Sequence, residues 1–198
     1  MRIGPFVIIE NDVFIDDGTT IDAHAHIKSY TTIGKNCKIF HGAVIGEIPQ
    51  DLKFNNEITE LIIGDSTTIR EYCTLNRGTK DSGSTIIGNN CLLMAYVHIA
   101  HDCIINDNCI LANGVQLGGH VEIGKHVTIG GMTPVHQFCK IGDYAFIGGG
   151  YRIVQDVPPY IKAMGEPLRY YGINSVGLSR NNFPEKMIKK IKYIYKTI

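Results

Sequence analysis

Aliphatic residues recur at every sixth position along most of this chain. The residue four places after each of them is usually small or β-branched. The aliphatic positions form three runs: Ile3, Ile9, Ile15, Ile21, Ile27, Ile33, Ile39 and Ile45; Ile63, Ile69 and Leu75; and Ile87, Leu93, Ile99, Ile105, Leu111, Leu117, Ile123, Ile129, Val135, Ile141, Ile147 and Ile153. This spacing predicts two inward-facing positions in every six residues.

A period of six matches neither the 3.6 residues per turn of an α-helix nor the alternation of a flat strand. A chain that turns a corner every six residues explains it, because three edges make one triangular coil of 18 residues. Such coils stack as parallel strands about 4.8 Å apart. The sequence therefore predicts an all-β fold, a parallel β-helix of hexapeptide repeats over residues 1–158.

Three further segments depart from the repeat. Residues 51–62 and 81–86 interrupt it without changing its phase, so we expect loops outside the prism, where functional residues often lie. Residues 159–183 are rich in turn formers and predict an extended cover. Residues 184–198 begin with a proline and carry apolar residues at helical spacing, which predicts a short C-terminal α-helix.

Composition narrows the class of protein. The chain has 198 residues and a formal net charge of zero, which argues for one domain and against nucleic-acid binding. No apolar run approaches the roughly 18 residues that a membrane span needs. The N-terminal MRIGPFVIIE is not a signal peptide, because a proline and an acidic residue interrupt it. We expect a soluble, cytoplasmic protein.

The six cysteines share one register, four residues after the aliphatic position. They are Cys37, Cys73, Cys91, Cys103, Cys109 and Cys139. That register faces into the prism, where a thiol acts as a small apolar filler. A disulfide or zinc framework would not keep all six in one packing position, so we expect reduced, structural thiols.

The histidines all lie outside the two inward registers. From residue 87 to 158 the repeat is uninterrupted, so residues 18 apart stack on successive coils. This stacking gathers one outward strip on three coils: His101, Asp102, Gly119, His120, His136 and Gln137. The strip is a candidate active site, although outward histidines can also align by chance.

The chemistry of the strip suits general-base catalysis. Histidine titrates near neutral pH and accepts a proton from a hydroxyl, and the carboxylate of Asp102 can hold one nitrogen of His101. A glycine stacked on the base, Gly119, lets a backbone N–H approach a reacting oxygen. A lone prism has no deep cleft, so we expect a second subunit to close the strip.

Several stretches together carry a resemblance to a known family. They are IGEIPQDLKF (45–54), IREYCTLNRGT (69–79), LLMAYVHIAHDC (92–103), GGHVEIG (118–124), GGMTPVHQFCKIG (130–142) and QDVPPYIKAMG (155–165). In these stretches the chain resembles the UDP-N-acetylglucosamine acyltransferases of lipid A biosynthesis. The resemblance runs almost from end to end.

The resemblance implies a left-handed β-helix that forms a homotrimer with its sites between neighbours. It implies transfer of a 3-hydroxyacyl group from acyl carrier protein to the glucosamine 3-position of UDP-N-acetylglucosamine, with no cofactor and no metal. Family members usually carry another coil before this chain begins and further helices after it ends, so the resemblance implies a shortened or partial chain. The chain also departs from the family at Val176 and Asn181, where family members commonly carry charged residues.

The resemblance assigns roles to individual residues. His101 matches the general base, Asp102 its orienting partner, Gly119 the oxyanion donor and Gly149 the position that measures the acyl chain. The residues expected to bind substrate are Asp51, Lys53, His98, His120, His136, Gln137, Asn174 and Arg180.

Other readings stay open at this point. A trimeric β-helical zinc enzyme of the carbonic anhydrase kind would use three interface histidines as ligands. A sugar O-acetyltransferase using acetyl-CoA would keep the fold, and a binding solenoid would leave the His101–Asp102 pair idle. The C-terminal helix carries five lysines that either steer an acidic carrier protein or form a solvated face: Lys186, Lys189, Lys190, Lys192 and Lys196.

Overall fold

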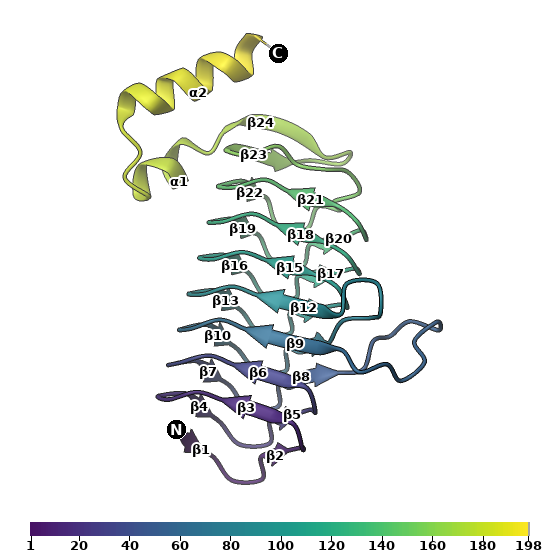
Figure 1. Ribbon diagram of the computed structural model, residues 1–198. Coiled ribbons are helices and arrows are strands. Elements are labelled where there is room, and N and C mark those ends of the chain that lie inside the picture. Colours follow the sequence, from purple (N-terminus) through teal and green to yellow (C-terminus); the bar gives the residue numbers. More distant parts are fainter. Residues whose placement is uncertain (198) are drawn as a thin grey trace.

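The computed structural model of this protein describes residues 1–197 and shows a three-sided prism (Figure 1). Each coil gives one strand to each of three sheets, and strands of successive coils pair in parallel. In the uninterrupted part the pairing offset is 18 residues, so that Ile99 lies opposite Leu117. The fold is the left-handed parallel β-helix that the repeat and the resemblance predicted.

The three sheets are named here A, B and C. Sheet A contains β1 (Arg2–Ile3), β4 (Thr20–Ile21), β7 (Lys38–Ile39), β10 (Thr68–Ile69), β13 (Leu92–Leu93), β16 (Ile110–Leu111), β19 (Thr128–Ile129), β22 (Phe146–Ile147), β23 (Ile161–Met164) and β24 (Arg169–Ile173). Sheet B contains β2 (Ile8–Ile9), β5 (His26–Ile27), β8 (Val44–Glu47), β11 (Thr74–Asn76), β14 (His98–Ile99), β17 (Gln116–Leu117) and β20 (Pro134–Val135). Sheet C contains β3 (Val13–Ile15), β6 (Thr31–Ile33), β9 (Glu60–Ile63), β12 (Ser84–Ile87), β15 (Ile104–Ile105), β18 (Glu122–Ile123) and β21 (Lys140–Ile141).

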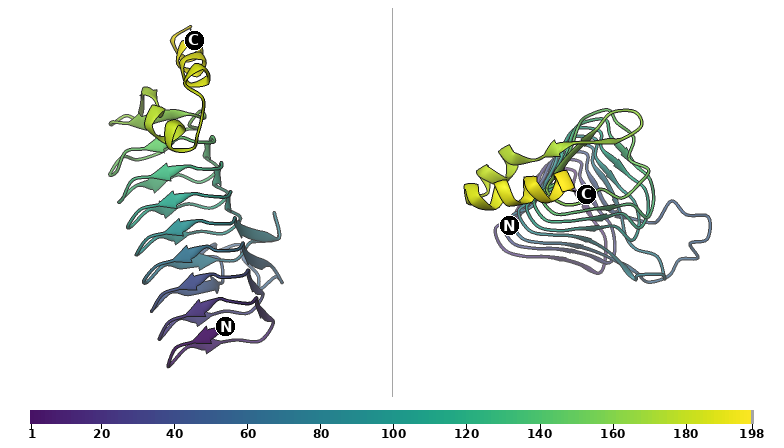
Figure 2. Two further views of the ribbon diagram at one scale, coloured as in Figure 1. Left: turned by 90° about the vertical axis from the view of Figure 1, so that its left-hand side faces the viewer. Right: turned by 90° about the horizontal axis from the view of Figure 1, so that it is seen from above.

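Three corners connect the sheets, and the view from above shows them stacked along the prism (Figure 2). The chain turns from sheet A to B, from B to C and from C back to A, at what we call the A–B, B–C and C–A corners. Most turns use one residue with positive φ, as at Asp102 (60°), His120 (61°) and Phe138 (67°) on the B–C corner. Residues in this position therefore stack above one another along the corner.

The core is formed by the two inward registers of the repeat. Ile99, Ile123 and Val115 are completely buried, and a buried aliphatic side chain stabilises the fold by about 1.5–3 kcal/mol. All six cysteines are free and buried, as predicted. Burial raises the pKa of Cys73 and Cys103 to about 12, so these thiols are protonated fillers rather than nucleophiles.

Two loops leave the prism at the B–C corner. They occupy residues 48–59, between β8 and β9, and residues 77–83, between β11 and β12. The ranges expected from the sequence, 51–62 and 81–86, lie slightly later along the chain. The difference arises because Ile63 and Ile87, the aliphatic residues at which the repeat resumes, are the last residues of β9 and β12 and not the first.

The segment after the last full coil forms a hairpin and two helices. β23 continues sheet A in parallel, and β24 folds back on it in antiparallel pairing. The extended cover expected over 159–183 thus contains this hairpin and also a short helix, α1 (Ser175–Arg180). The final helix is α2 (Glu185–Thr197).

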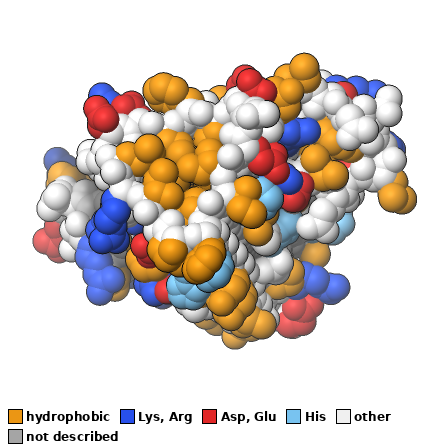
Figure 3. Space-filling model, turned by 90° about the horizontal axis from the view of Figure 1, so that it is seen from below, with side chains coloured by type: hydrophobic (Ala, Val, Ile, Leu, Met, Phe, Trp, Pro, Cys, Tyr) orange, Lys and Arg blue, Asp and Glu red, His pale blue; other side chains and the backbone are white. Residues whose placement is uncertain are grey.

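The two ends of the prism differ. The hairpin and helices lie over the last coil (Figure 1), whereas apolar side chains are visible across the end formed by the first coil (Figure 3). There Ile3 and Ile9 hold inward registers but remain 45% and 38% exposed. No helix within residues 1–197 combines the length and apolar character needed to cross a membrane.

Candidate active site

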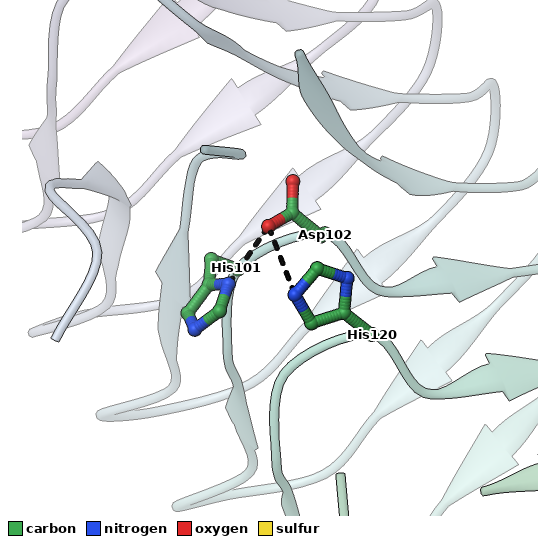
Figure 4. A group of neighbouring side chains, drawn as sticks. All are labelled: His101, Asp102 and His120. Atoms are coloured by element: carbon green, nitrogen blue, oxygen red, sulfur yellow. Dashed lines mark hydrogen bonds and ion pairs between the residues drawn. The ribbon is translucent and has the colours of Figure 1, made fainter. Parts of the chain in front are cut away.

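The candidate site lies at the B–C corner, on the turns that follow β14 and β17. The first turn carries His101 and Asp102, and the second carries Gly119 and His120. Figure 4 shows the two imidazoles converging on one carboxylate. Because both loops leave the prism at this same corner, the site lies beside the least regular part of the scaffold.

His101 and Asp102 form a hydrogen-bonded pair. The distance from Nδ1 of His101 to Oδ2 of Asp102 is 2.8 Å, and the Asp102 side chain is fully buried. An ionised carboxylate only accepts hydrogen bonds, so we assign the proton to Nδ1. Nε2 of His101 is then left with a free lone pair, which is the arrangement a general base requires.

The 77–83 loop supplies further donors to Asp102. The backbone N–H of Thr79 donates to Oδ1 at 2.8 Å, and the Thr79 hydroxyl donates to Oδ2 at 2.7 Å. The hydroxyl of Ser82 also donates to Oδ1. Burial disfavours the charged form, but the hydrogen bonds from Ser82, His101 and Thr79 together outweigh it and lower the pKa of Asp102.

Gly119 lies against the ring of His101. A Cβ built on Gly119 would stand 2.6 Å from Cε1 and 2.8 Å from Nε2 of His101, so a larger residue here would displace the imidazole ring. At the equivalent turn of the C–A corner, the N–H of Lys125 donates to the Asp143 carboxylate of the next coil at 2.8 Å. The corresponding residue above Gly119 is Gln137, and within residues 1–197 the Gly119 N–H has no such acceptor. It is available to a reacting oxygen.

Two more histidines border the pair. Nε2 of His120 lies 3.6 Å from Oδ2 of Asp102, and its ring stacks on Phe138 with centroids 4.6 Å apart. His98 comes from β14 and its Nδ1 lies 2.8 Å from the Thr74 hydroxyl. Burial lowers the pKa of His98, so its imidazole is neutral near pH 7 and serves as a hydrogen-bonding group.

A metal ion would find three ligand atoms here. Among the described residues, His101, Asp102 and His120 offer ligand atoms within 4.8 Å of one another. However, both oxygens of Asp102 already accept hydrogen bonds from Thr79, and Oδ2 also accepts from His101. These hydrogen bonds stabilise Asp102 as an anion and occupy the oxygens that zinc would have to bind at 2.0–2.2 Å.

The other residues predicted on the strip lie on the same corner. His136 and Gln137 are exposed on the coil above Gly119, and Nδ1 of His136 lies 3.1 Å from the Gln137 carbonyl oxygen. Asp51 and Lys53 belong to the 48–59 loop, where the Lys53 N–H donates to the Asp51 carboxylate at 2.9 Å. Both line a cavity of about 70 Å³ together with Thr79, so this loop reaches the residue that holds Asp102.

Three predicted residues lie elsewhere in the chain. Asn174 and Arg180 line a cavity of about 530 Å³ between α1 and strands of sheet A, at the C–A corner. Gly149 lies at the A–B corner, where its added Cβ would stand 3.0 Å from the carbonyl oxygen of Gly131. One chain therefore does not bring these residues to His101.

Thr79 and Ser82 were not predicted from the sequence to contact Asp102. Residues were matched across coils by steps of 18, but the 77–83 loop breaks that count, so Thr79 precedes Asp102 by 23 residues. Helix α1 was not predicted either. The signal was present there, because Asn174 is a favourable N-cap whose side chain accepts from the Gly177 N–H at 3.1 Å.

Comparison with known proteins adds family information. Residues 156–198 match the family described as Udp N-acetylglucosamine O-acyltransferase, Domain 2, and residues 84–119 match bacterial transferase hexapeptide repeats. The chain is 53% identical over its full length to the acyl-[acyl-carrier-protein]–UDP-N-acetylglucosamine O-acyltransferase of Sulfurovum sp., and covers 76% of that protein. The chain belongs to the UDP-N-acetylglucosamine O-acyltransferase family.

Solved structures agree with this membership. LpxA of Acinetobacter baumannii matches 99% of the chain with a TM-score of 0.96 and 46% identity, and 76% of that protein is covered. The UDP-N-acetylglucosamine acyltransferase of Francisella novicida matches 98% with a TM-score of 0.96 and 39% identity, and 74% of it is covered. As a member of this family, the protein is an acyltransferase and not a binding solenoid without catalysis. The two alternative enzymes, a zinc enzyme of the carbonic anhydrase kind and a sugar O-acetyltransferase using acetyl-CoA, are not favoured.

Proposed function

We propose that the protein transfers a 3-hydroxyacyl group from acyl carrier protein to the glucosamine 3-position of UDP-N-acetylglucosamine, in lipid A biosynthesis. The observation that carries this proposal is the His101–Asp102 pair lying against Gly119 in a member of this family. The family name supplies the two substrates, and the pair supplies the chemistry.

In the first step, Nε2 of His101 removes the proton of the sugar hydroxyl as its oxygen attacks the thioester carbonyl carbon. Asp102 stabilises the imidazolium that forms, because it is buried, ionised and hydrogen-bonded to Nδ1. The carbonyl oxygen becomes an oxyanion and accepts a hydrogen bond from the Gly119 N–H.

In the second step, the tetrahedral intermediate collapses and the carbon–sulfur bond breaks. His101 returns its proton to the departing thiolate, so the base is regenerated and the carrier leaves as a free thiol. The new ester remains on the sugar nucleotide. Every proton is accounted for by one imidazole, and no covalent enzyme intermediate is needed.

We include assembly as a homotrimer in the proposal. Asn174 and Arg180 would hold the nucleotide end of the acceptor, and Asp51 and Lys53 its sugar end, with His98, His120, His136 and Gln137 around the reacting groups. Because the α1 cavity lies at the C–A corner and the catalytic pair at the B–C corner, a ligand that touches both must bridge two chains.

Helix α2 would receive the acidic donor carrier. Its lysines lie on an exposed helix, and only Lys189 is paired there, with Glu185 at 2.7 Å, within the described residues. A cytoplasmic location, where carrier and sugar nucleotide are made, completes the proposal.

One assay tests the function. Radiolabelled UDP-N-acetylglucosamine is incubated with the protein and with 3-hydroxyacyl carrier proteins of graded length, and acylated sugar nucleotide is separated from substrate. We expect product only with an acyl carrier donor; product with acetyl-CoA alone would favour an acetyltransferase. Light scattering on the same sample should give three times the chain mass, and an active monomer would contradict the shared site.

A further inference from the structure

Unpartnered buried polar atoms gather where the 48–59 loop joins the prism. Within residues 1–197 they are Thr31 Oγ1, Thr59 Oγ1, Asn76 Oδ1 and Arg77 Nε. Thr31 pairs with Leu61 beside the end of this loop, and Thr59 is the last residue of the loop itself. Because buried polar groups are normally hydrogen-bonded, their concentration at the base of one loop requires an explanation.

Arg77 is the exceptional member of this group. It is only 8% exposed, and the ion pairs of arginines within the described residues involve Arg2, Arg70 and Arg152 instead. A buried cation without an acidic partner is costly unless other contacts compensate. Here the compensation is aromatic: the guanidinium carbon lies 5.2 Å from the ring centroid of Tyr30 and 5.6 Å from that of Phe54.

The two rings belong to different parts of the fold. Tyr30 lies on the rigid prism, immediately before β6, whereas Phe54 lies on the 48–59 loop. Phe54 closes a turn with Asp51, because its N–H donates to the Asp51 carbonyl oxygen at 3.0 Å. Arg77 therefore connects the turn that carries Asp51 and Lys53 to the scaffold.

A second attachment of the loop lies at its first residue. The Asn76 side chain donates to the Ile48 carbonyl oxygen at 2.7 Å, and the Arg77 N–H donates to the Glu47 carbonyl oxygen at 3.0 Å. Two residues further on, Thr79 donates twice to Asp102. Residues 76–79 thus contact the loop on one side and the catalytic carboxylate on the other.

We propose that Arg77 is a positioning residue that holds the 48–59 loop through Phe54 and so sets where the sugar nucleotide lies relative to His101. This inference rests on the proposed function, in which Asp51 and Lys53 bind that substrate. In this role the guanidinium acts through its contact with Phe54 and not on the substrate or the reacting atoms themselves. Its effect is expected on acceptor binding, not on the chemical step.

The test compares Arg77→Met, Phe54→Leu and the double variant. Arg70→Met is the matched control, because Arg70 also lies over an aromatic ring, 4.5 Å from the centroid of Phe40, but at the A–B corner. Amide hydrogen exchange of residues 48–59 is measured on the substrate-free protein. KM for UDP-N-acetylglucosamine, KM for the acyl donor and kcat are measured separately.

We expect faster exchange in the loop and an acceptor KM raised about tenfold in both single variants, within the range of cation–π contributions. The double variant should be no worse than either single one, because both changes break one contact. Donor KM and the Arg70→Met enzyme should be unchanged. If Arg77→Met fails to fold, Arg77→Lys replaces it, because lysine keeps the charge but lacks the planar guanidinium. Comparing Arg77→Lys with Phe54→Leu then tests the same contact.

Three results would each overturn the positioning role. They are additive effects of the two substitutions, unaltered amide exchange in the loop, and a fall in kcat with an unchanged acceptor KM. Faster exchange with unchanged acceptor KM would support the contact between Arg77 and Phe54. That result would instead remove Asp51 and Lys53 from the sugar-nucleotide site, so the two proposals fail separately.

Discussion

The ring of His101 lies directly over Gly119, so close that a β-carbon there would stand 2.6 Å from Cε1. Gly119→Ala should therefore push the imidazole from its position and also narrow access to the Gly119 N–H. We expect kcat to fall by about 10²-fold or more, the usual cost of losing a general base or an oxyanion donor. Steady-state kinetics with saturating substrates measures it.

Lys35→Ala is the matched control, because Lys35 occupies the equivalent turn position at the C–A corner, where its side chain is exposed and its N–H donates to the Asp65 carboxylate. Its activity should stay near that of the native enzyme. Native kcat in Gly119→Ala would show that the ring and the glycine are not coupled in catalysis.

His101→Ala should abolish transfer while leaving the fold and assembly intact, because His101 points outward and fills no core position. General-base contributions are about 10²–10⁴-fold, and we expect a loss of at least the lower figure. Circular dichroism and light scattering accompany the assay. A variant that loses its circular dichroism signal would indicate a structural role for His101 instead.

Prolonged treatment with a chelator should leave activity unchanged. Asp102 accepts hydrogen bonds from Thr79, Ser82 and His101, which occupy the lone pairs that a metal would need. Activity and metal content by mass spectrometry are measured before and after treatment. Loss of activity that zinc restores would identify the histidine cluster as a metal centre.

The Glu10 carboxylate, which pairs with Lys28 near the first coils, should make the stability of the fold depend on pH in the acid range. The hydrogen bond from Lys28 lowers the pKa of Glu10 to about 2, against the effect of burial and with help from Ser29 and His26. A depressed folded-state pKa stabilises the fold above the unfolded value near 4.5, and this contribution is lost as the pH falls through 2. Thermal melts should show Glu10→Gln less stable than native at pH 7, with the gap closing toward pH 2. A constant gap would contradict the assignment, and Glu166→Gln is the exposed control.

Gly149→Met should shift donor preference toward shorter acyl chains if the tail passes the A–B corner of a neighbouring chain. Each buried methylene contributes about 0.8 kcal/mol, so losing room for two to four changes selectivity by roughly one to two orders of magnitude. The ratio of kcat/KM across graded donors measures this. An unchanged ranking of donors would remove Gly149 from chain-length selection.

The periodic part of the molecule was predictable from sequence because covalent spacing and spatial stacking coincide there. Between residues 87 and 158, steps of 18 place Gly119 against His101 and Gln137 above it, as the structure does. The donors to Asp102 were not predictable in this way. Thr79 reaches Asp102 across a loop whose path depends on local hydrogen bonds, and a repeat carries no information about it.

In the C-terminal part of the chain, too, only some of the structure could be predicted from the sequence. The helical spacing of apolar residues predicted α2, since a long amphipathic segment has a strong signal. The short helix α1 has too few residues for a periodic pattern, and its cap at Asn174 is visible only as a single favourable residue. The separation of Arg180 from His101 follows from which corner each turn occupies, and it becomes visible once the coils are stacked.

The six buried thiols give the prism built-in chemical probes of local opening. They are distributed from Cys37 to Cys139, with none exposed by more than 5%, so a thiol reagent can reach each one only when its coil separates from its neighbours. In a stack where each coil contacts only the next, opening free energies can differ along the axis. Labelling followed by peptide mapping would therefore measure the stability of the scaffold coil by coil, without introducing a single mutation.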